Sequence, residues 1–262
     1  MTAGRRTTSQ AASANGQLKD IAMTDHTMKA FDTDLQDLAR MVAEMGGLAE
    51  KQVADAVDAL AKRDTTLAQR ITAADTNIDA LQREIEEKAV LTIARRQPMA
   101  VDLREIVGAL RLANDLERIG DLAKNIAKRV IALNAEFPPP KLIRGVEHMA
   151  DLVLGQLKAV LDAYAQRDIN KAMAVWRGDE EIDAMTTSVF RELLTYMMED
   201  PRNITFCIHL LFCAKNIERM GDHATNIAET LHYMIEGRPV IDKRPKGDDT
   251  TAFAALRAAA DR

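Results

Sequence analysis

The feature that most constrains this chain is an internal repeat that spans most of its length. The segment DLERIGDLAKNIAK (residues 115–128) returns as NIERMGDHATNIAE (residues 216–229), 101 residues later. Upstream, KRDTTLAQRITAADTNIDAL (62–81) matches QRDINKAMAVWRGDEEIDAM (166–185) at an offset of 104. Each copy is therefore one structural unit, and the chain is expected to fold as two such units.

Apolar residues spaced three or four apart predict three helices in each copy. We expect helices over about 28–63, 67–95 and 100–134, then 142–167, 170–199 and 202–236. The second copy lost three residues between its second and third helices, where each copy has one proline, Pro98 or Pro201. A turn between helices tolerates such a deletion, so each proline marks a hairpin turn.

The expected fold class is all-α, with two tandem antiparallel three-helix bundles related by the repeat. Aromatic residues make up only 4% of the chain, and glycine and proline are sparse, which favours helices over strands. The bundles cover residues 28–134 and 142–236, and three consecutive prolines (138–140) separate them. A disordered extension is expected over residues 1–27 and a C-terminal tail over 242–262.

Pairs of acidic residues four apart lie on the apolar side of the predicted helices. Glu117 and Asp121 lie seven and eleven residues after Leu110, which places both about 20° from it around the helix. Glu218 and Asp222 have the same relation to Leu211. These acids therefore continue the apolar stripe instead of facing solvent, which an isolated acidic pair on a helix usually does.

The second helix of each copy carries its own acidic pair, at the matching distance from the turn. Residues equally far from the turn of an antiparallel hairpin face each other, so four carboxylates gather at one level in each copy. The arginines that follow Glu117 and Glu218 point about 100° away from them. Bound cations are then the simplest relief of the mutual repulsion. The candidate metal ligands are Asp75, Asp79, Glu117, Asp121 and Asn125 in the first copy, and Asp179, Asp183, Glu218, Asp222 and Asn226 in the second.

Oxygen ligands suit hard cations such as Mg²⁺, Mn²⁺, Ca²⁺ or iron. Gly120 and Gly221 follow the Glu-Arg-x pattern in mid-helix, where glycine indicates a close approach of a neighbouring group. Ordinary tight helix packing explains these glycines equally well.

The segments LERIGD and IERMGDHATNIAE resemble the two signature segments of the PhoU family, and ARRQPMAVDLREI resembles its first hairpin turn. The resemblance covers about residues 28–236 and implies a PhoU-like fold whose acidic pairs bind divalent or multinuclear metal (Mg, Mn, Fe or Zn). It implies a cytoplasmic negative regulator of the phosphate regulon that also restrains phosphate uptake. The implied partners are the ATPase subunit of the phosphate ABC transporter and the phosphate sensor histidine kinase. One departure is Asn203, which stands where the first copy has Asp102.

The sequence is also compatible with two other functions. A carboxylate-bridged di-metal enzyme is one, but the Glu-x-x-His motif of helical di-iron enzymes does not occur here, so we expect no enzyme. A metal-independent structural adaptor is the other. Exposed Met and Leu on long helices favour a homodimer.

The net charge of −5 argues against a nucleic-acid partner. The sequence contains no run of 18 apolar residues, so we expect no direct membrane insertion. Cys207 and Cys213 are expected to be reduced and buried in one helix.

Overall fold

A computed structural model describes residues 7–133 and 140–242, with side chains described for 30–133 and 142–242. All regular structure in these ranges is helical, so the predicted all-α fold class is confirmed. The elements are α1 (Thr7–Lys62), α2 (Thr65–Ala74), α3 (Thr76–Arg96), α4 (Ala100–Ala132), α5 (Pro140–Gln166), α6 (Ile169–Arg177), α7 (Asp179–Glu199), the 3-10 helix η1 (Pro201–Asn203) and α8 (Ile204–Glu236).

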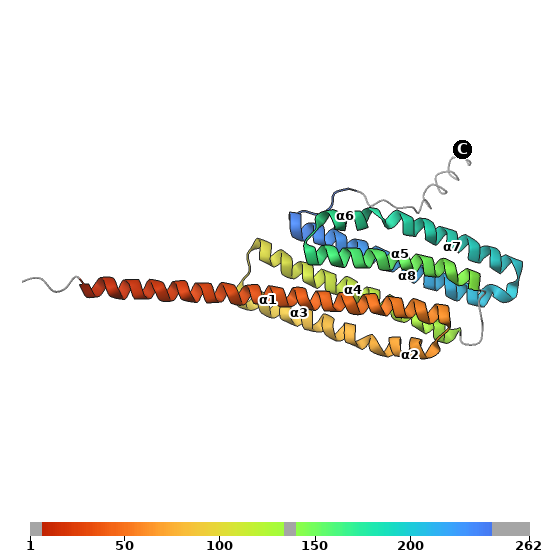
Figure 1. The fold of residues 1–262 in the computed structure, drawn as a ribbon, viewed down its shortest axis with the longest axis horizontal. Coiled ribbons are helices and arrows are strands. Elements are labelled where there is room, and N and C mark those ends of the chain that lie inside the picture. The colour runs from red at the N-terminus through yellow and green to blue at the C-terminus, as the bar shows by residue number, and fades with distance from the viewer. Residues whose placement is uncertain (1–6, 134–139, 243–262) are drawn as a thin grey trace, which may run out of the picture.

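The helices form two antiparallel bundles that lie side by side (Figure 1). Helices α1 to α4 pack together in the first bundle, and α5 to α8 pack together in the second. The main contact between the bundles joins α4 to α8, and α1 also packs against α5. The last helix of each repeat is therefore buried both within its own bundle and against the other, and the repeat seen in the sequence is confirmed in space.

The middle helix of each bundle is broken in two, which differs from the continuous helices expected over 67–95 and 170–199. The first break lies at Asp75, between α2 and α3, and the second at Gly178, directly before Asp179. Neither break involves proline. Both aspartates lie where the helix changes direction, and both are 3% exposed. The breaks therefore turn one carboxylate of each repeat into its bundle.

The turn that precedes each broken helix is the same in both copies. Arg63 and Arg167 adopt positive φ angles of 60° and 52°, which allow a tight reversal after α1 and α5. Asp64 then caps α2 by accepting a hydrogen bond from the Leu67 amide at 2.8 Å, and Asp168 caps α6 in the same way. These matched caps fix where the second helix of each repeat begins.

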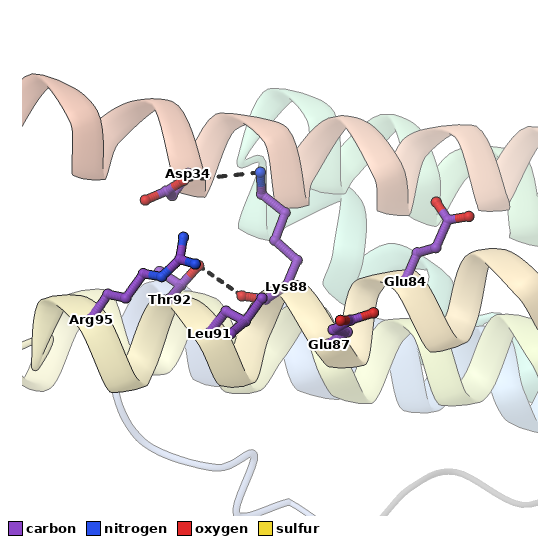
Figure 2. A pocket seen from close by; sticks show the side chains of 7 residues that line it. All are labelled: Asp34, Glu84, Glu87, Lys88, Leu91, Thr92 and Arg95. Atoms are coloured by element: carbon purple, nitrogen blue, oxygen red, sulfur yellow. Dashed lines mark hydrogen bonds and ion pairs between the residues drawn. The ribbon is translucent and has the colours of Figure 1, made fainter.

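Ion pairs tie α1 to α3 near one end of the first bundle. Lys88 Nζ lies 2.7 Å from Asp37 Oδ2 and 3.9 Å from Asp34 Oδ1, and Arg96 contacts Asp34 at 3.2 Å. Figure 2 shows Asp34 on α1 facing Lys88 on α3 beside a cavity of about 240 Å³. The hydrogen bond and charge of Lys88 lower the pKa of Asp37. These half-buried pairs still face solvent on one side and contribute modestly to stability, so their main effect is to set the register of α1 against α3.

Helix α1 begins at Thr7, about 21 residues earlier than the sequence suggests, and its N-terminal part extends beyond the bundle as a single helix (Figure 1). No proline occurs in residues 7–62, so no residue of this kind interrupts the helix between Thr7 and Lys62. Residues 1–6, 134–139 and 243–262 lie outside the described part of the chain. The disorder expected over 1–27 and the tail expected over 242–262 stay predictions.

Candidate acidic sites at the helix breaks

In the first bundle, the buried carboxylate at the helix break is held by residues of two other helices. Gln52 on α1 donates from Nε2 to Asp75 Oδ1 at 2.9 Å and also to the Gly120 carbonyl at 3.1 Å. Gln52 is 7% exposed. One amide group therefore joins α1, the break and α4 at a single level, which the repeat pattern of acids alone did not reveal.

Lys124 on α4 lies between two of the predicted metal ligands. Its Nζ is 2.5 Å from Asp75 Oδ2 and forms a second close contact with Asp121 Oδ1. Burial alone would lower the pKa of Lys124, but its hydrogen bonds to Asp121 and Asp75 raise it instead. Asp75 and Asp121 lie close together, as their equal distances from the hairpin turn predicted, and the protonated Lys124 side chain bridges them.

The other two acids of the first copy lie near the same cluster. Burial raises the pKa of Glu117, and the charges of Asp121 and Asp79 raise it further, whereas Arg118 lowers it. The Arg118 guanidinium lies 3.5 Å from Glu117 Oε2 and 3.8 Å from Asp121 Oδ2. The expectation that this arginine points away is wrong, because its long side chain folds back over the helix surface.

The second copy repeats the acids but not the lysine. The position equivalent to Lys124 is Thr225, which is fully buried and donates to the Gly221 carbonyl at 3.0 Å. Its hydroxyl lies 3.5 Å from Asp179 Oδ1. Lys215, one turn before Glu218, forms an ion pair with that glutamate from an exposed position. Asp183 and Asp222 are both partly buried.

The two asparagines predicted as additional ligands do not complete the clusters. Asn125 is exposed on α4. Asn226 faces the other bundle, where its Nδ2 lies 3.5 Å from Asp115 Oδ1. The same carboxylate oxygen is 2.8 Å from His223 Nδ1, so a contact between the bundles engages both residues. This contact could not be foreseen from one copy of the repeat, because it depends on how α4 and α8 pack.

The mid-helix glycines allow close packing of the broken helix. A Cβ atom at Gly120 would lie 2.9 Å from Ile78 Cδ1, and one at Gly221 would lie 2.9 Å from Ile182 Cδ1. The two isoleucines occupy equivalent positions in the repeat. Glycine is therefore explained by helix packing at the level of the acids, which is one of the two explanations left open by the sequence.

Two equivalent cavities lie beside the breaks, between the first helix of each repeat and the shorter broken segment. The first has a volume of about 310 Å³ and the second about 460 Å³. Their lining residues correspond across the repeat, including Gln52 with Gln156 and Ile71 with Val175. Oε1 of Gln156 is buried without a hydrogen-bond partner. The duplication thus extends to the spaces around the acids.

The donor geometry bears on the predicted metal sites. In the described residues, no group of three or more Asp, Glu, His or Cys side chains is arranged to hold a metal ion. In the first copy, the Lys124 ammonium already lies between Asp75 and Asp121, so those two carboxylates do not fit a metal ion placed between them. Lys124 was missed in the sequence, although its position three residues after Asp121 was a visible signal.

No helix within the described ranges is both long enough and apolar enough to span a membrane. Two paired helical bundles, with broken middle helices and a Glu-Arg-x-Gly-Asp motif facing each break, define a duplicated all-α bundle protein. The family model described as the PhoU domain matches residues 42–130 and 146–231. The chain therefore belongs to the PhoU family, as its signature segments predicted.

Proteins with named roles resemble the chain over nearly their full length. The phosphate-specific transport system accessory protein PhoU homolog of Rhizobium meliloti is 60% identical over 231 residues, which are 88% of this chain and 98% of that protein. The homolog of the same name from Caulobacter vibrioides is 54% identical over 226 residues, or 86% and 98% of the two chains.

Two solved structures share the fold. The PhoU crystal structure from Pseudomonas aeruginosa aligns with a TM-score of 0.77 at 41% identity, covering 79% of this chain and 100% of that one. The phosphate transport system regulatory protein PhoU from Streptococcus pneumoniae aligns with a TM-score of 0.74 at 29% identity, covering 80% and 99%.

Proposed function

We propose that this protein is a cytoplasmic negative regulator of the phosphate regulon that also modulates high-affinity phosphate uptake. The names of its relatives support this role, since they are accessory or regulatory proteins of phosphate transport systems. It acts as an adaptor between the ATPase subunit of the phosphate ABC transporter and the phosphate sensor histidine kinase. An adaptor needs a surface that another protein can recognise.

The observation that carries the adaptor role is an exposed apolar surface on the second hairpin, here called the α7–α8 face. It consists of Phe190, Leu194 and Met198 on α7 with Ile204, Ile208 and Phe212 on α8. Successive members are four residues apart on each helix, and the two rows lie at matching distances from Pro201 at the turn. The six side chains are between 41% and 79% exposed, so each presents apolar surface to solvent along the hairpin.

The size of the α7–α8 face supports a protein partner. If each large side chain exposes roughly 100 Å², the six together expose about 600 Å², at the upper end for a monomeric protein. Standard protein interfaces bury about 800 Å² on each partner, so this face with a polar rim is large enough. A partner that offers an apolar helix or groove would fit the stripe.

The first hairpin repeats only part of this surface, because Val90 and Leu103 are exposed at positions equivalent to Leu194 and Ile204. Glu86 replaces Phe190 and Arg111 replaces Phe212, so the end of the corresponding stripe far from the turn is charged. The Arg111 guanidinium lies over the Tyr233 ring at 5.3 Å, which places it at the junction of the bundles. The two copies therefore differ at the end of the hairpin far from the turn, and only in the second copy does the apolar stripe extend over its full length.

Metal binding remains part of the proposal for the second copy. A divalent cation held by Asp179, Asp183, Glu218 and Asp222 would supply positive charge between α7 and α8. Those residues lie on the same hairpin as the α7–α8 face, so stiffening the hairpin would shape the surface that a partner contacts. The protein itself is proposed to catalyse no reaction.

The adaptor role is tested by L194E, which places a charge at the centre of the α7–α8 face. Tagged wild-type protein from phosphate-replete cells should co-purify with the transporter ATPase or the sensor kinase, and L194E should lose at least tenfold of that partner. The matched control is V90E, because Val90 is the equivalent exposed residue of the first hairpin. Equal recovery of the partner with L194E and V90E would contradict the assignment of this face.

The homodimer expected from exposed apolar residues is a separate proposal with its own measurement. Analytical ultracentrifugation of the wild type should give a dimer at micromolar concentration. If L194E converts that dimer to a monomer while partner recovery is unchanged, the α7–α8 face joins two copies of this chain and not a regulatory partner.

A further inference from the structure

We propose that the ammonium group of Lys124 is the resident cation of the first acidic site, so that this site takes no divalent metal ion. The two repeats then differ in whether a lysine of the chain lies beside the buried aspartate at the helix break. This inference concerns the chain's own side chains and does not depend on the regulatory role proposed above.

The position of Lys124 is the first support. Its Nζ is 2.5 Å from Asp75 Oδ2 and also contacts Asp121 Oδ1, so it bridges the helix break to α4. A metal ion bound by the same two carboxylates would need oxygen distances of about 2.0–2.6 Å, which would place it almost on top of this nitrogen. Two cations cannot share that space without strong repulsion.

The remaining ligand capacity of Asp75 is the second support. Its other oxygen, Oδ1, accepts a hydrogen bond from Gln52 at 2.9 Å. Both oxygens of this buried carboxylate therefore have protein donors, one neutral and one charged. Arg118 adds a second positive group within 4 Å of Glu117 and Asp121. The first site thus carries its counter-charges on its own chain.

The second copy differs at the one position that matters for this argument. Thr225 replaces Lys124, is fully buried and carries no charge. Lys215 reaches Glu218 from a side chain that is 60% exposed, so it can move into solvent at little cost. Replacing Lys124 by threonine should therefore remove the charge that keeps a divalent cation out of the first site.

The test measures bound Mn²⁺ per chain in the purified full-length protein, by equilibrium dialysis and metal analysis. K124T gives the first site the residue of the second and should bind about one more Mn²⁺ than wild type. K124R, which keeps the positive charge, should match the wild type. An unchanged Mn²⁺ content in K124T would overturn the proposal.

A second variant keeps the proposal testable if K124T folds poorly. D121N preserves side-chain size and alters only the first site, so the Mn²⁺ content should stay at the wild-type value. A decrease of Mn²⁺ in D121N would show that the first site binds metal despite Lys124, and would also overturn the proposal. Circular dichroism of each variant confirms that helix content is retained.

Discussion

The ammonium nitrogen of Lys124 lies 2.5 Å from a carboxylate oxygen of Asp75, whose side chain is only 5% exposed. Removing the charge should leave that buried carboxylate without its ionic partner. We predict that K124M lowers the free energy of unfolding by about 2–3 kcal/mol in urea titrations, since breaking a buried pair is costly.

The matched control for this change is K128M, one turn further along α4, where the lysine is exposed. It should change the free energy of unfolding by less than about 0.5 kcal/mol. Equal stabilities of the two variants would mean that Lys124 does not neutralise Asp75 in the folded protein.

Glu117 should show the opposite effect of charge removal at neutral pH. Burial raises the pKa of Glu117, and nearby carboxylates raise it further. The protonated form is therefore favoured in the folded state, and this contribution is present below the unfolded pKa and lost as pH rises through the folded pKa. E117Q should stabilise the protein at pH 7 by up to about 0.5 kcal/mol after solvent screening.

The pH dependence separates this cause from a packing effect. The gain from E117Q should shrink as pH falls from 7 to 4, because the wild-type carboxyl becomes increasingly protonated in both the folded and unfolded states. Urea unfolding of both proteins between pH 4 and pH 7, within the range where the fold persists, measures it. A gain that is constant across this range would exclude ionisation of Glu117 as its source.

The contact between the bundles gives a third stability prediction. Asp115 Oδ1 lies 2.8 Å from His223 Nδ1 and 3.5 Å from Asn226 Nδ2, with Asp115 8% exposed. D115L should cost about 1–3 kcal/mol of unfolding free energy, because polar groups of α8 lose their acceptor. D115N introduces the residue found at the equivalent position of the second copy and retains an acceptor oxygen. It should cost less than half as much, and equal costs would contradict the hydrogen-bonding account.

Much of the fold could be predicted because the repeat fixes the same pattern twice. The hairpin turns at Pro98 and Pro201 are where the deletion between the copies placed them. Equal spacing from the turn correctly brought Asp75 to the level of Asp121. These predictions needed only helical periodicity and chain direction, which are local properties of the sequence.

The features that the sequence did not predict depend on the length of individual side chains and on the packing between helices. The breaks at Asp75 and Gly178 carry no proline, so the periodicity runs through them without a signal. Lys124 and Arg118 have long side chains, which bend along the surface of α4 and contact acidic residues that a helical wheel places in other directions. Asn226 turned to Asp115 instead of Asp222 because α8 packs on α4, and a single repeat contains no information about that interface.

The α7–α8 face also lay outside the sequence prediction, although its spacing was visible. Leu194 and Ile208 read as core residues in a periodic helix, and only the bundle arrangement leaves them 45% and 41% exposed. The first-copy residues Glu86 and Arg111 show that the fold does not require apolar side chains at the end of this stripe far from the turn. The first hairpin also exposes apolar residues nearer its turn, such as Val90 and Leu103, so the two repeats differ at the end of the stripe far from the turn.

The most direct test of the account is a phosphate-starvation reporter in a Rhizobium meliloti strain that lacks its own 60% identical relative. In phosphate-rich medium, expression of this chain or of V90E should return the reporter to its repressed level, and L194E at equal protein abundance should leave it at least fivefold higher. A reporter that is already silent in the deletion strain, or full repression by L194E, would contradict a regulator that acts through the α7–α8 face.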